Sequence, residues 1–144
     1  MTIMPNGRMP PTQPTAPKVG AVVAATPPQF LTLGGQNALF VLEEYGRGAL
    51  GTMPACEFPD LLRPVLDLWD KGERDHARAA FTALLPLVRF GLQPGIAWSI
   101  HKHVLVSRGV IASAMVRAPA TDADAGTLAD LELLLADHGW AARG

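Results

Sequence analysis

Two short apolar runs enclose one helical pattern in the first half of the chain, and this order constrains the fold more than any other feature. The first run, FLTL at 30–33, stops at Gly34-Gly35, and the second, ALGTM at 49–53, stops at Pro54. Between them, apolar residues recur at helical spacing, at Ala38, Leu39, Leu42 and Tyr45. A strand, a helix and a strand joined by tight turns pair the strands in parallel through a right-handed crossover. We therefore predict an α/β arrangement whose apolar strands are covered on both faces.

Helical patterns account for the chain after Pro59. Gly72 should end the first helix, and Pro86 should kink the second or close it early. Either Thr121 or Asp122 can serve as N-cap of the fourth helix. The inward-facing residues of the four predicted helices are, in order, Leu61, Leu62, Val65, Leu66 and Trp69; Ala77, Ala80, Phe81, Leu84 and Val88; Ile96, Ile100 and Val104; and Leu128, Leu131 and Leu135.

Prolines dominate the start of the chain, at positions 5, 10, 11, 14 and 17. Proline fixes φ and lacks a backbone donor, so we predict that residues 1–17 form a loop or a disordered tail. A short helix should open with Pro17 in its first turn and end before Pro27. The same segment contains one arginine and no apolar stretch of the signal-peptide kind, so we do not expect secretion.

The charge balance excludes several classes of partner. Twelve Lys and Arg against thirteen Asp and Glu give a net charge of -1, which offers no basic field to nucleic acid or to an anionic membrane. No apolar run reaches the 18 or so residues expected of a membrane span. With 49% hydrophobic and 17% charged residues, the chain is predicted to be a soluble, globular protein. Its single cysteine, Cys56, excludes an intramolecular disulfide, agrees with a reducing cytoplasm, and is interpreted as a small loop residue.

The histidines do not form a metal-binding motif. His101 and His103 are two residues apart on a predicted helix, so their imidazoles point to different faces and cannot easily share one ion. His76 and His138 have no cysteine or carboxylate partner at ligand spacing. We expect these two at the surface or at a helix cap.

Other polar clusters give no catalytic motif either. Glu43 and Glu44 are adjacent in a predicted helix, so their side chains diverge, and we expect one to belong to a solvated face rather than to an acid/base pair. No serine lies in a G-x-S-x-G elbow. Gly34-Gly35 lacks the third glycine and the downstream acidic residue of a dinucleotide-binding motif, so nucleotide binding is not supported.

Six short segments, taken in order, resemble a single enzyme family. They are PTAPKV at 14–19, LGGQN at 33–37, GALGTMP at 48–54, KGERDHARAAFTALLPL at 71–87, K-x-x-L-x-x-x-G from Lys102 to Gly109, and R-x-P from Arg117 to Pro119. Their order and spacing are similar to the C-terminal portion of the dihydrodipicolinate synthase / N-acetylneuraminate lyase family of class I Schiff-base aldolases. The resemblance implies α/β architecture, namely the last two strands of a (β/α)8 TIM barrel followed by a C-terminal helical bundle. It divides the chain into a Pro-rich segment at 1–17, a partial barrel at 18–57 and a helical region at 58–144.

The resemblance also implies where the chemistry should lie. Family members form an imine between a strand-six lysine and a 2-keto acid, usually pyruvate. Counting back from PTAPKV, the lysine position is Met9, whose thioether cannot form an imine; Arg8 stays protonated, and Lys18 belongs to the next helix. We therefore predict no catalytic residue within the chain. Gly35 and Met53 are the predicted wall of the substrate pocket; the alternative is that Gly35 is only a turn residue and Met53 only a core residue.

Three functional hypotheses follow. The first is a truncated family member, or one with a misassigned start, that acts on a 2-keto acid only when the missing part is supplied. It uses no metal or other cofactor, and it forms a homo-oligomer or associates with a full-length relative. The alternative is a non-catalytic interaction module that self-associates through an exposed strand edge and leucine-rich helices. The third is a degraded gene product without function, which would lack a cooperative thermal transition.

Overall fold

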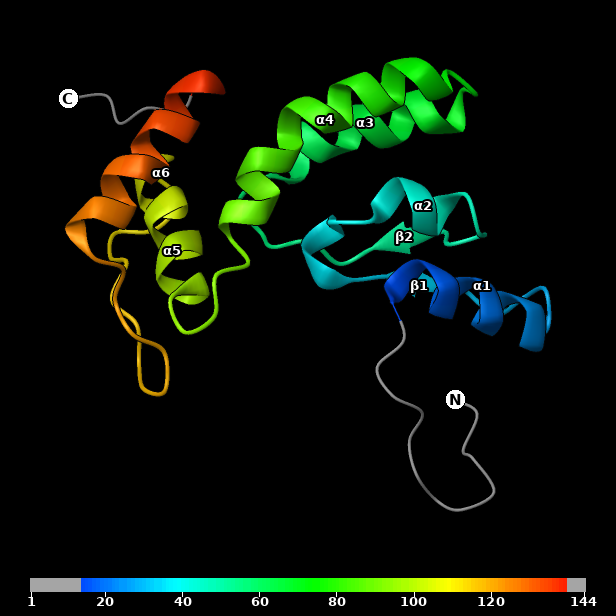
Figure 1. Ribbon diagram of the computed structural model, residues 1–144, viewed down its shortest axis with the longest axis horizontal. Coiled ribbons are helices and arrows are strands. Elements are labelled where there is room, and N and C mark those ends of the chain that lie inside the picture. Colours follow the sequence, from blue (N-terminus) through cyan, green and yellow to red (C-terminus); the bar gives the residue numbers. More distant parts are fainter. Residues whose placement is uncertain (1–13, 140–144) are drawn as a thin grey trace. The chain divides into compact units, whose positions relative to one another are not determined.

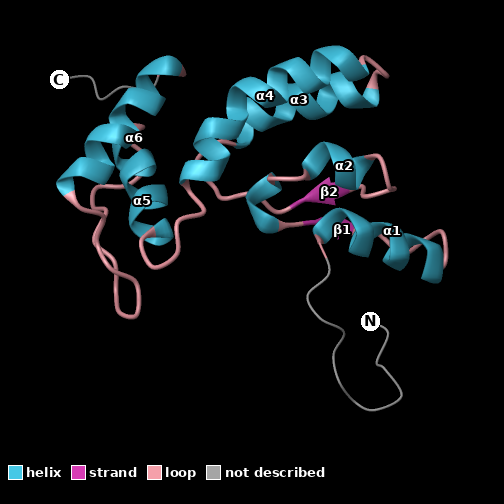
Figure 2. Cartoon of the chain, viewed as in Figure 1, coloured by secondary structure: helices cyan, strands magenta, loops and turns pink. Residues whose placement is uncertain are grey.

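The computed structural model describes residues 14–139, and these belong to two compact units. The first ends at Pro54 and the second begins at Ala55. This division lies a few residues before the predicted boundary between 57 and 58. Figure 1 labels the elements along the chain, and Figure 2 separates helices from strands. Each unit is described by itself.

The first unit is a small two-stranded parallel sheet with helices against it. Leu33 lies opposite Gly51, and Gly34 lies opposite Thr52, so the predicted parallel pairing is confirmed. Helices α1 and α2 contact each other and both contact β1 (Figure 1). The elements are α1 (Thr15–Ala25), β1 (Leu33–Gly34), a single 3-10 turn at Gln36–Ala38, α2 (Val41–Tyr45) and β2 (Gly51–Thr52). The buried apolar residues of this unit are Ala16, Val19, Ala38, Val41, Leu42 and Ala49.

Two expectations for the first unit are wrong. Helix α1 begins at Thr15, so residues 15–17 are helical rather than part of a loop. Pro17 is compatible with this start because the first backbone N–H groups of a helix have no intrahelical partner. The strands are also not covered on both faces, because Leu31 and Leu33 are 68% and 51% exposed. Within residues 14–54, the helices cover only one face of the pair.

The second unit contains four helices between residues 55 and 139. The antiparallel hairpin of α3 and α4 turns at Gly72, whose φ of +81° favours glycine. Helix α6 contacts both α4 and α5. The helices are α3 (Pro59–Asp70), α4 (Arg74–Phe90), α5 (Ala97–Ser107) and α6 (Ala125–Asp137). Most of the predicted inward positions are buried, among them Leu62, Val65, Ala77, Phe81, Leu84, Val88, Ile100, Val104, Leu131 and Leu135. No described helix has the length and apolar character needed to cross a membrane.

Two local predictions in this unit need correction. Of the two outcomes predicted at Pro86, a kink or an early end, the early end is wrong: α4 continues to Phe90, because Leu87, Val88 and Phe90 bury its last turns in the core. The N-cap of α6 is Asp124 rather than Thr121 or Asp122. Its carboxylate accepts a hydrogen bond from the Thr127 backbone N–H at 2.7 Å, and hydrogen bonds from Thr127 lower the pKa of that carboxyl.

Candidate functional site

The carboxyl ends of β1 and β2 lie at the same edge of the sheet, because the strands are parallel. Gly35 directly follows β1 and Met53 directly follows β2. Gly35 and Met53 each lie one residue beyond the last paired residues, Gly34 and Thr52. The two predicted wall residues therefore follow the strands at the same edge of the sheet. Parallel α/β sheets and barrels bind their ligands at this carboxyl edge.

The turn after Gly35 is tightly constrained. Three consecutive non-glycine residues have left-handed backbone, with φ of 48° at Gln36, 56° at Asn37 and 62° at Ala38. Such conformations cost about 1–3 kcal/mol each and persist only where the surrounding structure fixes them. A backbone hydrogen bond from Ala38 N–H to the Gly35 carbonyl, 3.0 Å long, closes the turn. The backbone at the site edge is thus held in one defined path into α2.

A buried carboxylate lies behind this edge. Glu44 on α2 has 0% exposure, and its Oε1 accepts a long hydrogen bond of 3.4 Å from the Gly35 N–H. Its Oε2 has no hydrogen-bond partner within the described residues. A Cβ atom at Gly34 would lie 1.8 Å from that Oε2, so any side chain at position 34 would force the Glu44 carboxylate to shift. Glu43 is exposed, and the two carboxylates diverge as predicted.

The space in front of the edge is open. A Cβ atom built at Gly35 would meet no atom within 4 Å. The Met53 side chain is 65% exposed, so it is not a core residue in this chain. Gly35 leaves backbone accessible, and Met53 adds an apolar, polarizable side chain beside it. This combination can form one wall of a pocket, but it offers no nucleophile or general acid/base group.

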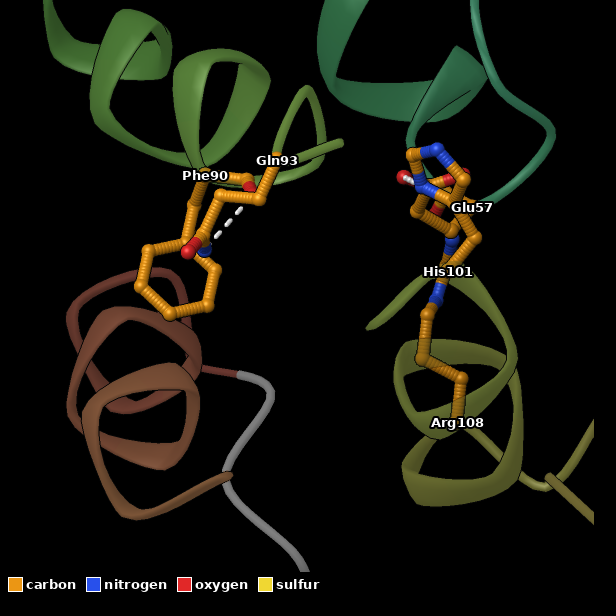
Figure 3. Close-up of polar contacts among 5 residues, drawn as sticks. All are labelled: Glu57, Phe90, Gln93, His101 and Arg108. Carbon is orange, nitrogen blue, oxygen red and sulfur yellow. Dashed lines mark hydrogen bonds and ion pairs between the residues drawn. The ribbon is translucent and has the colours of Figure 1, made fainter. Parts of the chain in front are cut away.

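The second unit holds a separate polar cluster that joins the residues preceding α3 to α5 (Figure 3). Glu57 is 2% exposed, and its Oε1 lies 2.5 Å from Nδ1 of His101. Arg108 donates to the main-chain oxygen of Glu57 through Nη1 and to Oδ2 of Asp60, at 2.6 Å, through Nη2. The edge of the Trp98 ring faces His101, with 6.1 Å between ring centroids. Oε2 of Glu57 has no hydrogen-bond partner within the described residues, whereas Oε1 and the main-chain oxygen are both bonded. These contacts tie the start of α3 to α5, which indicates a structural role.

The remaining histidines agree with their predicted surface or cap positions. His76 is exposed and lies 3.1 Å from the Glu73 carboxylate, and His138 is the C-cap of α6. His101 faces Glu57 rather than His103. In the part of the chain that is described, no group of three or more His, Cys, Asp and Glu residues could hold a metal ion.

The other residues considered from the sequence lie away from the site. Met9 and Arg8 fall outside the described residues. Lys18 is exposed on α1, and the Lys102 amine donates to the main-chain oxygen of Met115 at 2.5 Å. Cys56 lies exposed in a turn, as interpreted from the sequence.

Comparison with known proteins supports the resemblance. No protein-family model matches the chain. Over 98 residues, which are 67% of this chain, it is 37% identical to the L-2-keto-3-deoxyarabonate dehydratase of Azospirillum brasilense. The dihydrodipicolinate synthase of Rhodopseudomonas palustris superposes with a TM-score of 0.78 at 32% identity over 85% of this chain. The chain corresponds to the C-terminal portion of the dihydrodipicolinate synthase family.

The match covers only part of each relative. The chain spans 31% of the length of the dehydratase and 42% of the Rhodopseudomonas palustris synthase. The dihydrodipicolinate synthase of Oceanobacillus iheyensis, with a TM-score of 0.76 at 20% identity, supports the fold alone, and 43% of its chain is covered. These neighbours are TIM-barrel proteins, so the two parallel strands and the helices of this chain correspond to a fragment of that architecture.

Sequence reasoning missed two buried carboxylates, Glu44 and Glu57. The glycines of the LGG turn could indicate a buried side chain nearby, but the sequence alone does not show that this side chain is Glu44, which lies against Gly34. Glu57 and His101 are 44 residues apart in the chain, so no local pattern connects them.

Proposed function

We propose that this chain forms one wall of the substrate site of a dihydrodipicolinate synthase-family lyase, which acts on a 2-keto acid such as pyruvate through a Schiff base. The proposal is supported by the positions of Gly35 and Met53, which directly follow two paired parallel strands at the same carboxyl edge, and by the free space within 4 Å of a Cβ atom built at Gly35. A relative with 37% identity is named for a 2-keto acid, which supports this class of substrate.

We further propose that the chain alone forms no imine. Covalent catalysis of this kind needs a lysine amine within reach of the substrate carbonyl. Met9, at the position matched to the imine lysine, has no amine. The described site edge contains Gly35 and Met53 and no lysine. In this proposal, the lysine comes from the part of the family barrel that this chain does not cover. We expect no cofactor, and we expect the protein to work in the cytoplasm, where exposed Cys56 would stay reduced.

Borohydride trapping tests both statements. The purified chain is incubated with pyruvate and sodium borohydride, and its mass is measured before and after digestion. We expect no adduct, whereas a stable mass increase on Lys18 or Lys102 would overturn the second statement. Full-length Rhodopseudomonas palustris synthase serves as the control that the reagents trap an imine.

A fusion tests the wall itself. The portion of the Rhodopseudomonas palustris synthase that precedes the match is joined directly to this chain, and the rate of adduct formation is followed by mass. We expect an adduct that forms more slowly when Met53→Asp puts a charge at the wall. Met115→Asp is the matched control, because Met115 is 74% exposed and lies in the other unit. Equal rates for both variants, or no adduct on the fusion, would contradict the proposal.

A second candidate is a self-association module, which the exposed Leu31 and Leu33 of the sheet favour. Light scattering over a range of chain concentrations distinguishes it. A monomer at the highest concentration would exclude this candidate.

A further inference from the structure

Among the described residues of the first unit, one apolar face of the sheet is left uncovered. Side chains alternate between the faces of a strand. Thr32 and Gly34 are buried on the face that α1 and α2 cover, whereas Leu31 and Leu33 are 68% and 51% exposed. The Leu33 side chain also extends across β2, where a Cβ atom at Gly51 would lie 2.7 Å from its Cδ2. Leu31 and Leu33, here called the leucine face, therefore present an apolar surface that reaches over both strands.

The strand edges are uncovered as well. Within the described residues the sheet contains only β1 and β2, so each strand has one edge without a neighbouring strand. Leu50 and Met53, on either side of β2, are both 65% exposed. Unpaired edges beside an apolar surface pair readily with further strands. Two strands of two residues each are too short to be stable as an isolated sheet.

We propose that the leucine face and both strand edges dock the strand-bearing N-terminal portion of a barrel of the same family, which closes the sheet into a barrel. This inference rests on the proposed function and names its partner. In a closed parallel barrel every strand has two neighbours, and inward side chains fill the interior. The chain spans 42% of the Rhodopseudomonas palustris synthase, so the rest of that protein is the portion which could supply the neighbours.

A second copy of this chain fits the surface less well. A twofold axis would bring two identical edges together, and the opposite edge of each sheet would stay unpaired. A second copy would also contribute only two further short strands, the β1 and β2 of its own sheet, to cover the leucine face. A partner that brings strands to both edges at once covers the edges and the face together, so we commit to the barrel portion.

Co-expression provides the test. The 144-residue chain is produced together with a tagged N-terminal portion of the Rhodopseudomonas palustris synthase, ending where the match begins. Size-exclusion chromatography with light scattering should give a one-to-one complex. Leu31→Lys/Leu33→Lys should weaken the complex by roughly tenfold or more, because two apolar side chains lose their burial. Leu133→Lys is the matched control, since Leu133 on α6 is 70% exposed and lies outside the sheet. Circular dichroism checks that each variant keeps the helical content of the parent.

Several outcomes would overturn the inference. These are the absence of a complex, a tagged portion that stays insoluble beside the chain, equal binding by the lysine variants, or a homodimer that forms through the leucine face instead. The outcome for the proposed function is read separately. A complex that traps no pyruvate adduct would support the docking inference and contradict the lyase proposal. A direct fusion that traps an adduct, while the separate chains do not associate, would support the lyase proposal and contradict the docking inference.

Discussion

The buried pair of Glu57 and His101 allows a sharp test of what stabilises the second unit. Replacing His101 by leucine removes the imidazole that lies 2.5 Å from Glu57 Oε1 and leaves the carboxylate, 2% exposed, without that partner. Breaking a buried ion pair from one side costs about 3–5 kcal/mol, because the remaining charge stays desolvated. Small domains have a total stability of only about 5–15 kcal/mol, so we expect His101→Leu to be severely destabilising.

The reverse replacement should be milder. Glu57→Leu leaves His101 without its acceptor, but the His101 side chain is 12% exposed and can still reach water, so we expect a loss of about 1–3 kcal/mol. The double variant Glu57→Leu/His101→Leu removes both polar groups and should be close to the parent in stability, because an apolar pair of similar volume often replaces a buried ion pair without loss. The sum of the two single-variant losses should therefore exceed the loss in the double variant by roughly 3 kcal/mol or more. This difference is at or above the upper end of the usual coupling range.

Urea unfolding followed by circular dichroism measures these changes. With a slope of about 1–3 kcal/mol per molar urea, a loss of about 3 kcal/mol lowers the midpoint by roughly 1–3 M. Asp67→Ala is a useful control, since Asp67 forms an exposed pair with Arg63 on α3 and should change stability little. A His101→Leu midpoint within about 0.3 M of the parent, or additive losses in the double variant, would refute the view that burial makes this pair costly to break.

Two further substitutions probe the edge and a cap. Gly34→Ala should destabilise the first unit by about 1–3 kcal/mol or more, because the methyl group would overlap the Glu44 carboxylate, whereas Gly35→Ala has free space and should be tolerated; urea unfolding of the two variants compares them directly. Asp124→Ala should destabilise α6 at neutral pH. Because hydrogen bonds from Thr127 lower the pKa of Asp124 in the folded chain, the difference from the parent should persist above the ordinary aspartate pKa and vanish as pH falls through the lowered one, and a difference that grows on acidification would contradict this sign.

The sequence predicts the order and pairing of elements better than their lengths. Glycine and proline stop the two apolar runs, and a helix between them requires parallel strands, which the structure confirms. The runs themselves overstate the strands, since only Leu33–Gly34 and Gly51–Thr52 find a partner within the described residues. Strand length depends on neighbours, and a local pattern carries no information about neighbours that lie in another part of the fold.

The helix N-cap and the buried carboxylates could not be predicted from the sequence for a related reason. Thr121, Asp122 and Asp124 are all capable N-caps, and the choice is made by tertiary contacts, because the Thr121 backbone N–H donates to the Gly95 carbonyl instead, at 3.0 Å. Glu44 is on a helix of five residues, and the burial of its side chain depends on the absence of a Cβ atom at Gly34, ten residues earlier in the chain. Such contacts can be recognised only when both partners are in place.

The arrangement behind the site edge helps to decide between the two candidate functions. Glu43 and Glu44 are neighbours on one helix, yet only Glu44 is buried, where its carboxylate pays a desolvation cost and gains one long hydrogen bond from Gly35. Self-association through the leucine face requires apolar side chains on the uncovered side of β1, and it gains nothing from a carboxylate on the covered side. A pocket wall, in contrast, requires a backbone turn that stays in one conformation beside open space. The contact of Glu44 with Gly34 and Gly35, followed by the left-handed turn at Gln36–Ala38, supplies that rigidity. The polar contacts at this edge therefore favour the substrate-site wall over the self-association module.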